Sequence, residues 1–129
     1  MLQTGIQGKA SVIVSDKNTA AAMKSGLLNV YATPMMVALM EDASMQSVQP
    51  YLKEGQTTVG TLVNVKHVSA TPEGMTVTAQ SELIEVDGRR LVFKVSAYDG
   101  TGLVGEGTHE RFIIDAERFM EKTKAKAQQ

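Results

Sequence analysis

Cysteine and tryptophan are absent from this sequence, and no hydrophobic stretch in it is long. Without cysteine the chain can form no disulfide bond, thiolate metal site or thiol nucleophile, and such a composition suits a reducing compartment. The longest uninterrupted apolar run, Met35 to Met40, is far shorter than the roughly 20 residues of a membrane-spanning helix. Met1 to Gly5 has neither the basic nor the apolar region of a secretory leader. We therefore expect a cytoplasmic protein that does not enter a membrane.

Excess charge of one sign is also missing. Lysine and arginine number 13 and aspartate and glutamate 14, which gives a net charge of −1, so no nucleic-acid partner is expected. The 2 histidines lie far apart in the sequence and the acids are not clustered, so no metal-ligand spacing is present. We expect neither a metal nor a redox cofactor.

What the sequence does have is enough apolar material for one hydrophobic core. Hydrophobic residues make up 43% of 129 residues, which is the size of a single domain. We therefore expect one domain over residues 1–129.

The central feature is a helix predicted from Pro34 to Val48. Thr33 and Pro34 are typical of an N-cap and a first helical residue, and Pro50 disfavours continuation of the helix. Every residue from Met35 to Met40 is apolar. A helix that is apolar on all sides is one that the fold encloses.

Alternating apolar residues predict five strands around this helix. The expected strands are Ile6–Val14, Thr57–Val68, Met75–Val86 with a bulge near Leu83 and Ile84, a strand with Leu91, Phe93, Val95 and Ala97 inward, and Leu103–Ile114 with Gly105, Gly107, His109 and Arg111 on one side. Asp87-Gly88 predicts a hairpin turn. Ala20–Met23 is expected to form one helical turn stopped by Gly26, and Asp115 to cap a last helix ending near Lys126.

The order predicts an α+β fold in which a curled antiparallel sheet surrounds the helix and the last four strands form a meander. In Thr57–Val68, alternation places Val59, Thr61, Val63, Val65 and His67 on the core side and Gly60 on the other. One such sheet leaves two edges and a face uncovered, so we expect a homodimer.

Three polar residues are predicted to point inward, namely Thr33, Glu41 and His67. Thr33, Val37 and Glu41 are four residues apart and so lie along one side of the helix, with Thr33 and Glu41 roughly 12 Å apart. An inward histidine on the following strand faces that helix, and a histidine with a carboxylate can transfer protons near neutral pH. The alternative is a cap, a helix-surface acid and a core histidine bonded to the backbone.

Three segments resemble a known family, the hot-dog-fold thioesterases of the fluoroacetyl-CoA thioesterase type. They are Ala32-Thr33-Pro34 through Glu41-Asp42-Ala43, Val59-Gly60-Thr61 through His67, and Gly107-Thr108-His109-Glu110-Arg111-Phe112. The resemblance covers nearly the whole chain. It implies a hot-dog fold, with about five strands curved around one long helix and a short C-terminal helix.

The resemblance also implies functional residues. Thr33, Glu41 and His67 match the catalytic set of the family, and Gly60 and Arg111 match residues that help bind the acyl-CoA. A homodimer with acyl-CoA bound along its interface is implied as well. The segment from Lys24 to Leu28 contains no phenylalanine to form an aromatic lid. The resemblance therefore implies cleavage of a thioester but not selectivity for fluoroacetyl-CoA.

We therefore expect an enzyme that hydrolyses an acyl-CoA thioester to the free acid and coenzyme A. Glu41 and His67 would supply acid, base or nucleophilic help, and Thr33 would attack or orient water. Two alternatives stay open at this point. One is a hot-dog hydratase or dehydratase acting on acyl thioesters, and the other is a non-catalytic module that binds acyl-CoA.

Overall fold

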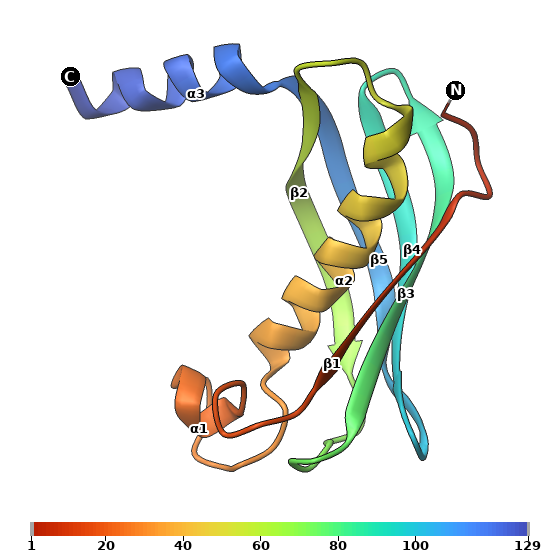
Figure 1. The fold of residues 1–129 in the computed structure, drawn as a ribbon, viewed down its shortest axis with the longest axis vertical. Helices are drawn as coiled ribbons and strands as arrows, with labels where there is room; N and C mark the ends of the chain where they lie inside the picture. The colour runs from red at the N-terminus through yellow and green to blue at the C-terminus, as the bar shows by residue number, and fades with distance from the viewer. Residues whose placement is uncertain (1, 129) are drawn as a thin grey trace.

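The computed structural model describes residues 2–128, which form a five-stranded antiparallel sheet curled around one long helix (Figure 1). The elements are β1 (Gln7–Ile13), α1 (Ala20–Met23), α2 (Thr33–Val48), β2 (Gln56–His67), β3 (Thr76–Asp87), β4 (Arg90–Asp99), β5 (Gly102–Asp115) and α3 (Ala116–Ala125), with short 3-10 turns at Gln49–Tyr51 and Lys126–Gln128. The predicted strands, central helix and C-terminal helix are all confirmed.

The order of strands differs from the predicted meander. Only β3, β4 and β5 follow one another as neighbours, and the full order is β1-β3-β4-β5-β2. β2 pairs with β5 rather than with β3, which follows it in sequence. Alternation identifies a strand but not its partner, and this prediction was wrong for that reason. As a result, β1 and β2 are the two edges of the sheet in the described chain.

Helix α2 lies on the concave side of the sheet, and the sheet covers only one side of it (Figure 1). The buried helix residues are Met36, Met40, Ala43, Ser44 and Val48. Pro34 and Ala38 are exposed although they belong to the apolar part of the helix. The expectation that the fold encloses this helix on all sides is thus wrong for a single chain, and an apolar surface stays uncovered.

The start of α2 also corrects the sequence analysis. Ala32 is the N-cap, with extended backbone, and Thr33 is the first helical residue. Thr33 therefore does not cap the helix. The prediction failed because proline is accommodated at the second helical position as well as at the first, which leaves the Thr33 hydroxyl free for another partner.

β2 contains a bulge that changes which residues face α2. Its register against β5 shifts between Gly60 and Leu62, so Gly60 lies opposite Arg111 and Val63 lies opposite His109. Because a bulge inserts one residue, the residues on either side of it lose their common phase. Gly60 therefore faces inward together with Val63 and His67. The inward placement predicted for Val59 and Thr61 was wrong.

Other local predictions hold with small corrections. The inward residues of β4, namely Leu91, Phe93, Val95 and Ala97, are buried, and β3 has its expected irregularity between Leu83 and Glu85. Asp115 caps α3 by accepting a hydrogen bond from the backbone of Arg118. Helix α1 ends at Met23, and its C-cap Lys24 adopts the left-handed conformation, so Gly26 is not the residue that stops it. Within residues 2–128, no helix combines the length and apolar character needed to cross a membrane.

Candidate active site

Thr33 and His67 form a hydrogen-bonded pair at one end of the concave side. Thr33 is the first residue of α2 and His67 the last of β2, and Thr33 Oγ1 lies 2.7 Å from His67 Nδ1. Burial lowers the pKa of His67, with the backbone of Ser69 opposing the effect. The imidazole is therefore neutral near pH 7 and can accept a proton. Its Nε2 is buried and has no hydrogen-bond partner among the residues that the structure describes.

Glu41 lies in a second group, two helical turns further along α2. Its Oε2 is 3.6 Å from Nη1 of Arg111, and its side chain is 39% exposed. The eight residues between Thr33 and Glu41 correspond to about 12 Å of helix. The structure thus brings Thr33 to His67 and Glu41 to Arg111, and it does not bring the three residues of the predicted set together within one chain.

Gly60 lies beside this second group, and its lack of a side chain leaves the group accessible. A Cβ at this position would lie 2.7 Å from Oε2 of Glu41, 3.3 Å from Cε1 of His109 and 3.4 Å from Nη1 of Arg111. A real Cβ does not approach an oxygen so closely without displacing it. The absence of a side chain at Gly60 therefore leaves space beside a carboxylate and a guanidinium, which is where a polar ligand atom could bind.

Arg111 is anchored from three directions beneath this space. Its Nε donates to Thr58 Oγ1 at 2.7 Å, its Nη2 to the Thr58 carbonyl at 2.9 Å, and its Nη1 lies 3.1 Å from His109 Nε2. The side chain is only 8% exposed, and burial lowers the pKa of Arg111 while Glu41 opposes the effect. A guanidinium fixed in this way is a pre-oriented donor for developing negative charge.

His109 and Thr58 are functional candidates that the sequence analysis did not select. Alternation along β5 places His109 on the same face as Arg111, so the sequence held a signal for the histidine. Thr58 had none, because the phase assigned to β2 was wrong before the bulge. In the described part of the chain, no group of three or more metal-ligating side chains occurs.

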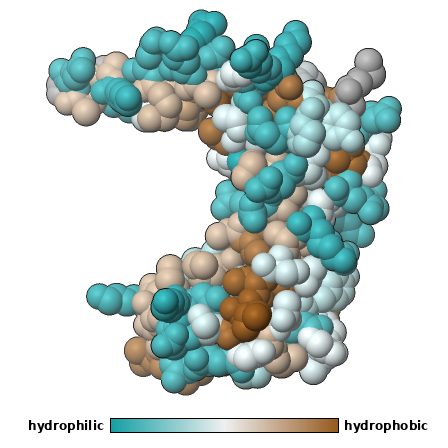
Figure 2. Space-filling model, viewed as in Figure 1, coloured by the Kyte–Doolittle hydropathy of each residue, from teal (hydrophilic) through white to brown (hydrophobic). Residues whose placement is uncertain are grey.

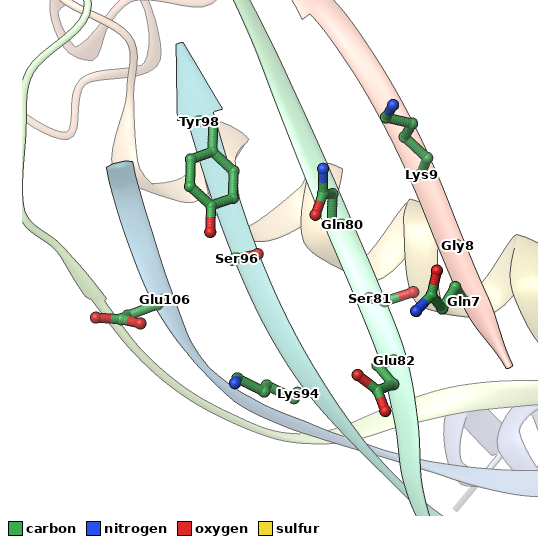
Figure 3. Close-up of a pocket in the computed structure, with 10 residues that line it drawn as sticks. All are labelled: Gln7, Gly8, Lys9, Gln80, Ser81, Glu82, Lys94, Ser96, Tyr98 and Glu106. Atoms are coloured by element: carbon green, nitrogen blue, oxygen red, sulfur yellow. The ribbon is translucent and has the colours of Figure 1, made fainter. Parts of the chain in front are cut away.

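A hollow of about 460 Å³ lies on the opposite face of the sheet from α2 (Figure 3). Its lining is polar and of mixed charge, with Lys9 and Lys94 balanced by Glu82 and Glu106. None of the predicted site residues lines it. Since the histidines and Arg111 point to the concave face, we place the chemistry there.

Comparison with known proteins points in the same direction as this geometry. A family model described as fluoroacetyl-CoA-specific thioesterase matches residues 14–117. A curated fluoroacetyl-CoA thioesterase from Streptantibioticus cattleyicolor is 48% identical over 97 residues, which cover 75% of this chain and 70% of that protein.

Solved structures agree with the fold. A structure of the fluoroacetyl-CoA thioesterase FlK covers 98% of this chain and 98% of its own, with 38% identity and a TM-score of 0.92. A variant of that protein in complex with fluoroacetate and CoA matches 92% of this chain and 99% of its own, with 39% identity and a TM-score of 0.86. A thioesterase superfamily member from Thermus thermophilus is 26% identical, covers 98% of this chain and 93% of its own, and has a TM-score of 0.90.

Proposed function

Because this chain belongs to the family of fluoroacetyl-CoA-specific thioesterases and is thus an acyl-CoA thioester hydrolase of hot-dog fold, we propose that Thr33, Glu41 and His67 carry out its chemistry. Gly60 and Arg111 would bind the thioester next to Glu41. The observation that carries this proposal is the pairing of Thr33 Oγ1 with a neutral His67 at 2.7 Å, since a hydroxyl bonded to an imidazole is the arrangement that activates a weak nucleophile or a water.

We assign different roles to the two groups, Thr33 with His67 and Glu41 with Arg111. His67 takes a proton from the Thr33 hydroxyl or from a water held by it, and returns the proton to the departing thiolate of coenzyme A. Arg111 and the space beside Gly60 receive the thioester carbonyl, whose oxygen becomes negative as the carbon is attacked. Where Thr33 or water attacks, Glu41 beside Arg111 orients the carbonyl or the water. Where Glu41 attacks instead, Thr33 keeps its proton, the carboxylate forms an anhydride as the thiolate leaves, and His67 transfers a proton to the thiolate from the water that hydrolyses the anhydride.

A homodimer would bring the two groups together, and β2 offers the edge for it. Leu62 and Val63 are exposed on this strand, which pairs on one side only in the described chain. If β2 strands of two copies pair in antiparallel fashion about an axis near Val63, His67 of one copy comes toward Gly60 of the partner subunit, with the concave faces of both sheets on the same side. Residues directly opposite in such a pair project from the same face.

The shape of the chain supports the same assembly. Figure 2 shows an open hollow on the concave side, between α3 at one end and the region of α1 at the other. The uncovered side of α2 lies in this hollow (Figure 1). A second copy seated there would cover the apolar helix surface and complete two sites of the same composition. We further propose a cytoplasmic location, which suits a cysteine-free chain.

The dimer proposal is tested by charge at the expected axis. Asn64→Lys places two like charges close together across the axis, so it should raise the dimer dissociation constant by at least about tenfold and lower activity in proportion to the monomer formed. Gln80→Lys, on the outer face of β3, is the matched control and should change neither. Sedimentation across a concentration series, with activity measured on the same samples, provides the readout. An active wild-type monomer would refute the composite site.

The route of hydrolysis is decided by trapping. Enzyme quenched during turnover and analysed by mass spectrometry will carry the acyl group on Thr33, on Glu41, or on neither residue if water attacks directly. Glu41→Gln preserves volume and removes the carboxylate, and should lower kcat by at least about 100-fold with the dimer intact. Turnover within a few-fold of wild type would exclude Glu41 from the chemistry.

Substrate choice is the second part of the assay. Leu27 is 95% exposed and lies in the segment without phenylalanine, so we propose that this enzyme discriminates weakly between fluoroacetyl-CoA and acetyl-CoA. Release of free thiol from each ester measures this directly. The same assay separates the alternatives: a hydratase would change an unsaturated acyl group without releasing thiol, and a binding module would show affinity without turnover.

A further inference from the structure

His109 is a deeply buried titratable side chain of the concave face, and the chemistry proposed above does not use it. The residue is 1% exposed, on β5, and its ring stacks on Phe93 with the ring centroids 6.2 Å apart. Its two nitrogens have different partners. Nδ1 lies 2.8 Å from the carbonyl oxygen of Leu62, and Nε2 lies 3.1 Å from Nη1 of Arg111.

These partners determine the protonation state of the ring. The Leu62 carbonyl can only accept, so Nδ1 bears the hydrogen. The guanidinium of Arg111 can only donate, so Nε2 must present its lone pair. A protonated ring would set an N–H of Nε2 against an N–H of Arg111. His109 is therefore a neutral imidazole whose tautomer is fixed from both sides.

The consequence for Arg111 follows from its five N–H groups. One bond from Nε and one from Nη2 go to Thr58, and one from Nη1 goes to His109. The Thr58 bonds hold one edge of the guanidinium, and the His109 bond fixes the remaining corner. The second N–H of Nη1 is then available to Glu41 Oε2, 3.6 Å away, and to the space beside Gly60.

The hydrogen bond to the Leu62 carbonyl also connects His109 to the backbone of β2. Leu62 stands at the end of the β2 bulge, where the register against β5 shifts. Gly60 and His67 are separated by an odd number of positions, and in a regular strand they would face opposite sides. The bulge brings both to the concave face, and His109 is bonded to a carbonyl at that bulge.

We propose that His109 is a positioning residue, which as a neutral imidazole ties the β2 bulge at Leu62 to Nη1 of Arg111 and so aims Arg111 at Glu41 and at the thioester carbonyl. This inference rests on the proposed role of Arg111 beside Glu41. Arg111 touches the substrate, and His109 acts through Arg111.

Two substitutions separate the two bonds of the ring. In His109→Asn the amide nitrogen can keep the bond to the Leu62 carbonyl, but no acceptor reaches Arg111. In His109→Gln the longer side chain places its amide oxygen near the former Nε2. We expect His109→Asn to lower kcat by at least about tenfold with KM changed less than about threefold, and His109→Gln to recover most of the loss. Activity is expressed per folded dimer, with thermal melting of both variants as the control.

A purely structural role would lower the melting temperature of both variants and leave kcat per folded dimer equal in the two, which would overturn the proposal. Wild-type kcat in His109→Asn would overturn it as well. The contrast between Asn and Gln is therefore the decisive result, because both variants replace the ring with a neutral amide and only Gln offers an acceptor to Arg111; kcat per folded dimer, compared with the melting temperature, separates this from the smaller size of Asn.

Nitrogen-15 NMR tests the proposal without any turnover. The Nη1 and Nη2 signals of Arg111 should be separate in wild type and in His109→Gln, and averaged by rotation in His109→Asn. The His109 signals should show a protonated Nδ1 and a bare Nε2 near pH 7. An imidazolium at this pH, or Arg111 signals unchanged in His109→Asn, would refute the positioning role. If instead wild type releases no thiol while these signals behave as expected, the proposed function fails and the geometry of the network stands.

Discussion

Replacing Gly60 with alanine perturbs the carboxylate group of the site without removing any charge. The new Cβ would lie 2.7 Å from Glu41 Oε2, and it would also make close contacts with His109 Cε1 at 3.3 Å and Arg111 Nη1 at 3.4 Å, to which these side chains must adjust slightly. Non-bonded heavy atoms are separated by about 3.5 Å at their optimum. The Glu41 carboxylate must therefore move away from the new Cβ by nearly the difference between 2.7 Å and this distance. Glu41 is 39% exposed and sits at the end of a flexible side chain. It can therefore swing toward solvent, away from Arg111, at little cost in stability.

The expected magnitude follows from this displacement. Moving a reacting group by about 1 Å can reduce the rate by about 100-fold, which corresponds to about 2.7 kcal/mol of transition-state stabilisation. The strand backbone at Gly60 is not in the left-handed region, so alanine there can add up to about 1 kcal/mol to folding stability. We thus expect kcat/KM for acyl-CoA to fall by about 100-fold while the melting temperature changes little, because the stiffer backbone and the close contact with buried His109 oppose each other.

Two other glycines serve as controls. At Gly100 a Cβ would meet only Cε of Met75 at 3.4 Å, so Gly100→Ala should change neither activity nor stability. At Gly107 a Cβ would overlap the backbone of Asn64 and lie 2.6 Å from Cα of Val65, so Gly107→Ala should destabilise the fold. Free-thiol release and thermal melting on all three variants complete the experiment. If Gly60→Ala kept activity within about threefold of wild type, the space beside Gly60 would not hold the thioester and the reasoning would be refuted.

Three further predictions concern other parts of the chain. Thr33→Ala should lower kcat/KM by at least about tenfold and Thr33→Ser should retain most of it, with little change in melting temperature because Ala32 and not Thr33 caps α2; equal activity of both variants would exclude the hydroxyl. Burial lowers the pKa of His67 in the fold, so the unfolded chain binds more protons than the folded chain just below pH 6.5. The stability present above that pH should therefore fall as the pH drops toward the folded pKa. Denaturant titrations at several pH values should show that the free energy of unfolding changes less steeply with pH in His67→Asn than in wild type. Hydrogen bonds from the Thr71 side chain and then from the Thr101 backbone lower the pKa of Asp99. The contribution of Asp99 to folding stability is therefore present above its unfolded pKa and lost as the pH falls through its folded pKa. Asp99→Asn should lower the melting temperature by about 4 °C at pH 7, and the melting temperature of this variant should fall less than that of wild type in acid.

The position of Asp99 also links stability to the site. Asp99 Oδ2 accepts a hydrogen bond from Thr71 Oγ1 at 2.7 Å, and the Thr71 carbonyl accepts one from the backbone of Tyr31. Tyr31 directly precedes the Ala32 cap and Thr33. The turn between β4 and β5 thus helps to hold the start of α2, where Thr33 meets His67.

Local features were determined by the sequence itself. Pro34 and Pro50 mark the two ends of the helix independently of the tertiary structure, because each proline restricts the backbone conformation of itself and of the residue before it. The predicted hairpin between β3 and β4 is present, although its two loop residues are Gly88 and Arg89 rather than Asp87 and Gly88, and Gly88 has a φ of 61°, which glycine adopts readily. Asp115 caps α3. These are interactions between residues a few positions apart, so a pattern in the sequence contains all their partners.

The arrangement of the site was decided only by tertiary structure. Period-two alternation reports a shared face only while no residue is inserted, so the bulge in β2 reversed the expected side of Gly60 and hid Thr58. The choice of β5 as the partner of β2 depends on segments about fifty residues apart. The same long-range pairing sets Arg111 and His109 against Glu41 and leaves Thr33 with His67. The sequence predicted candidate residues of the site, and the three-dimensional packing decided which of them meet.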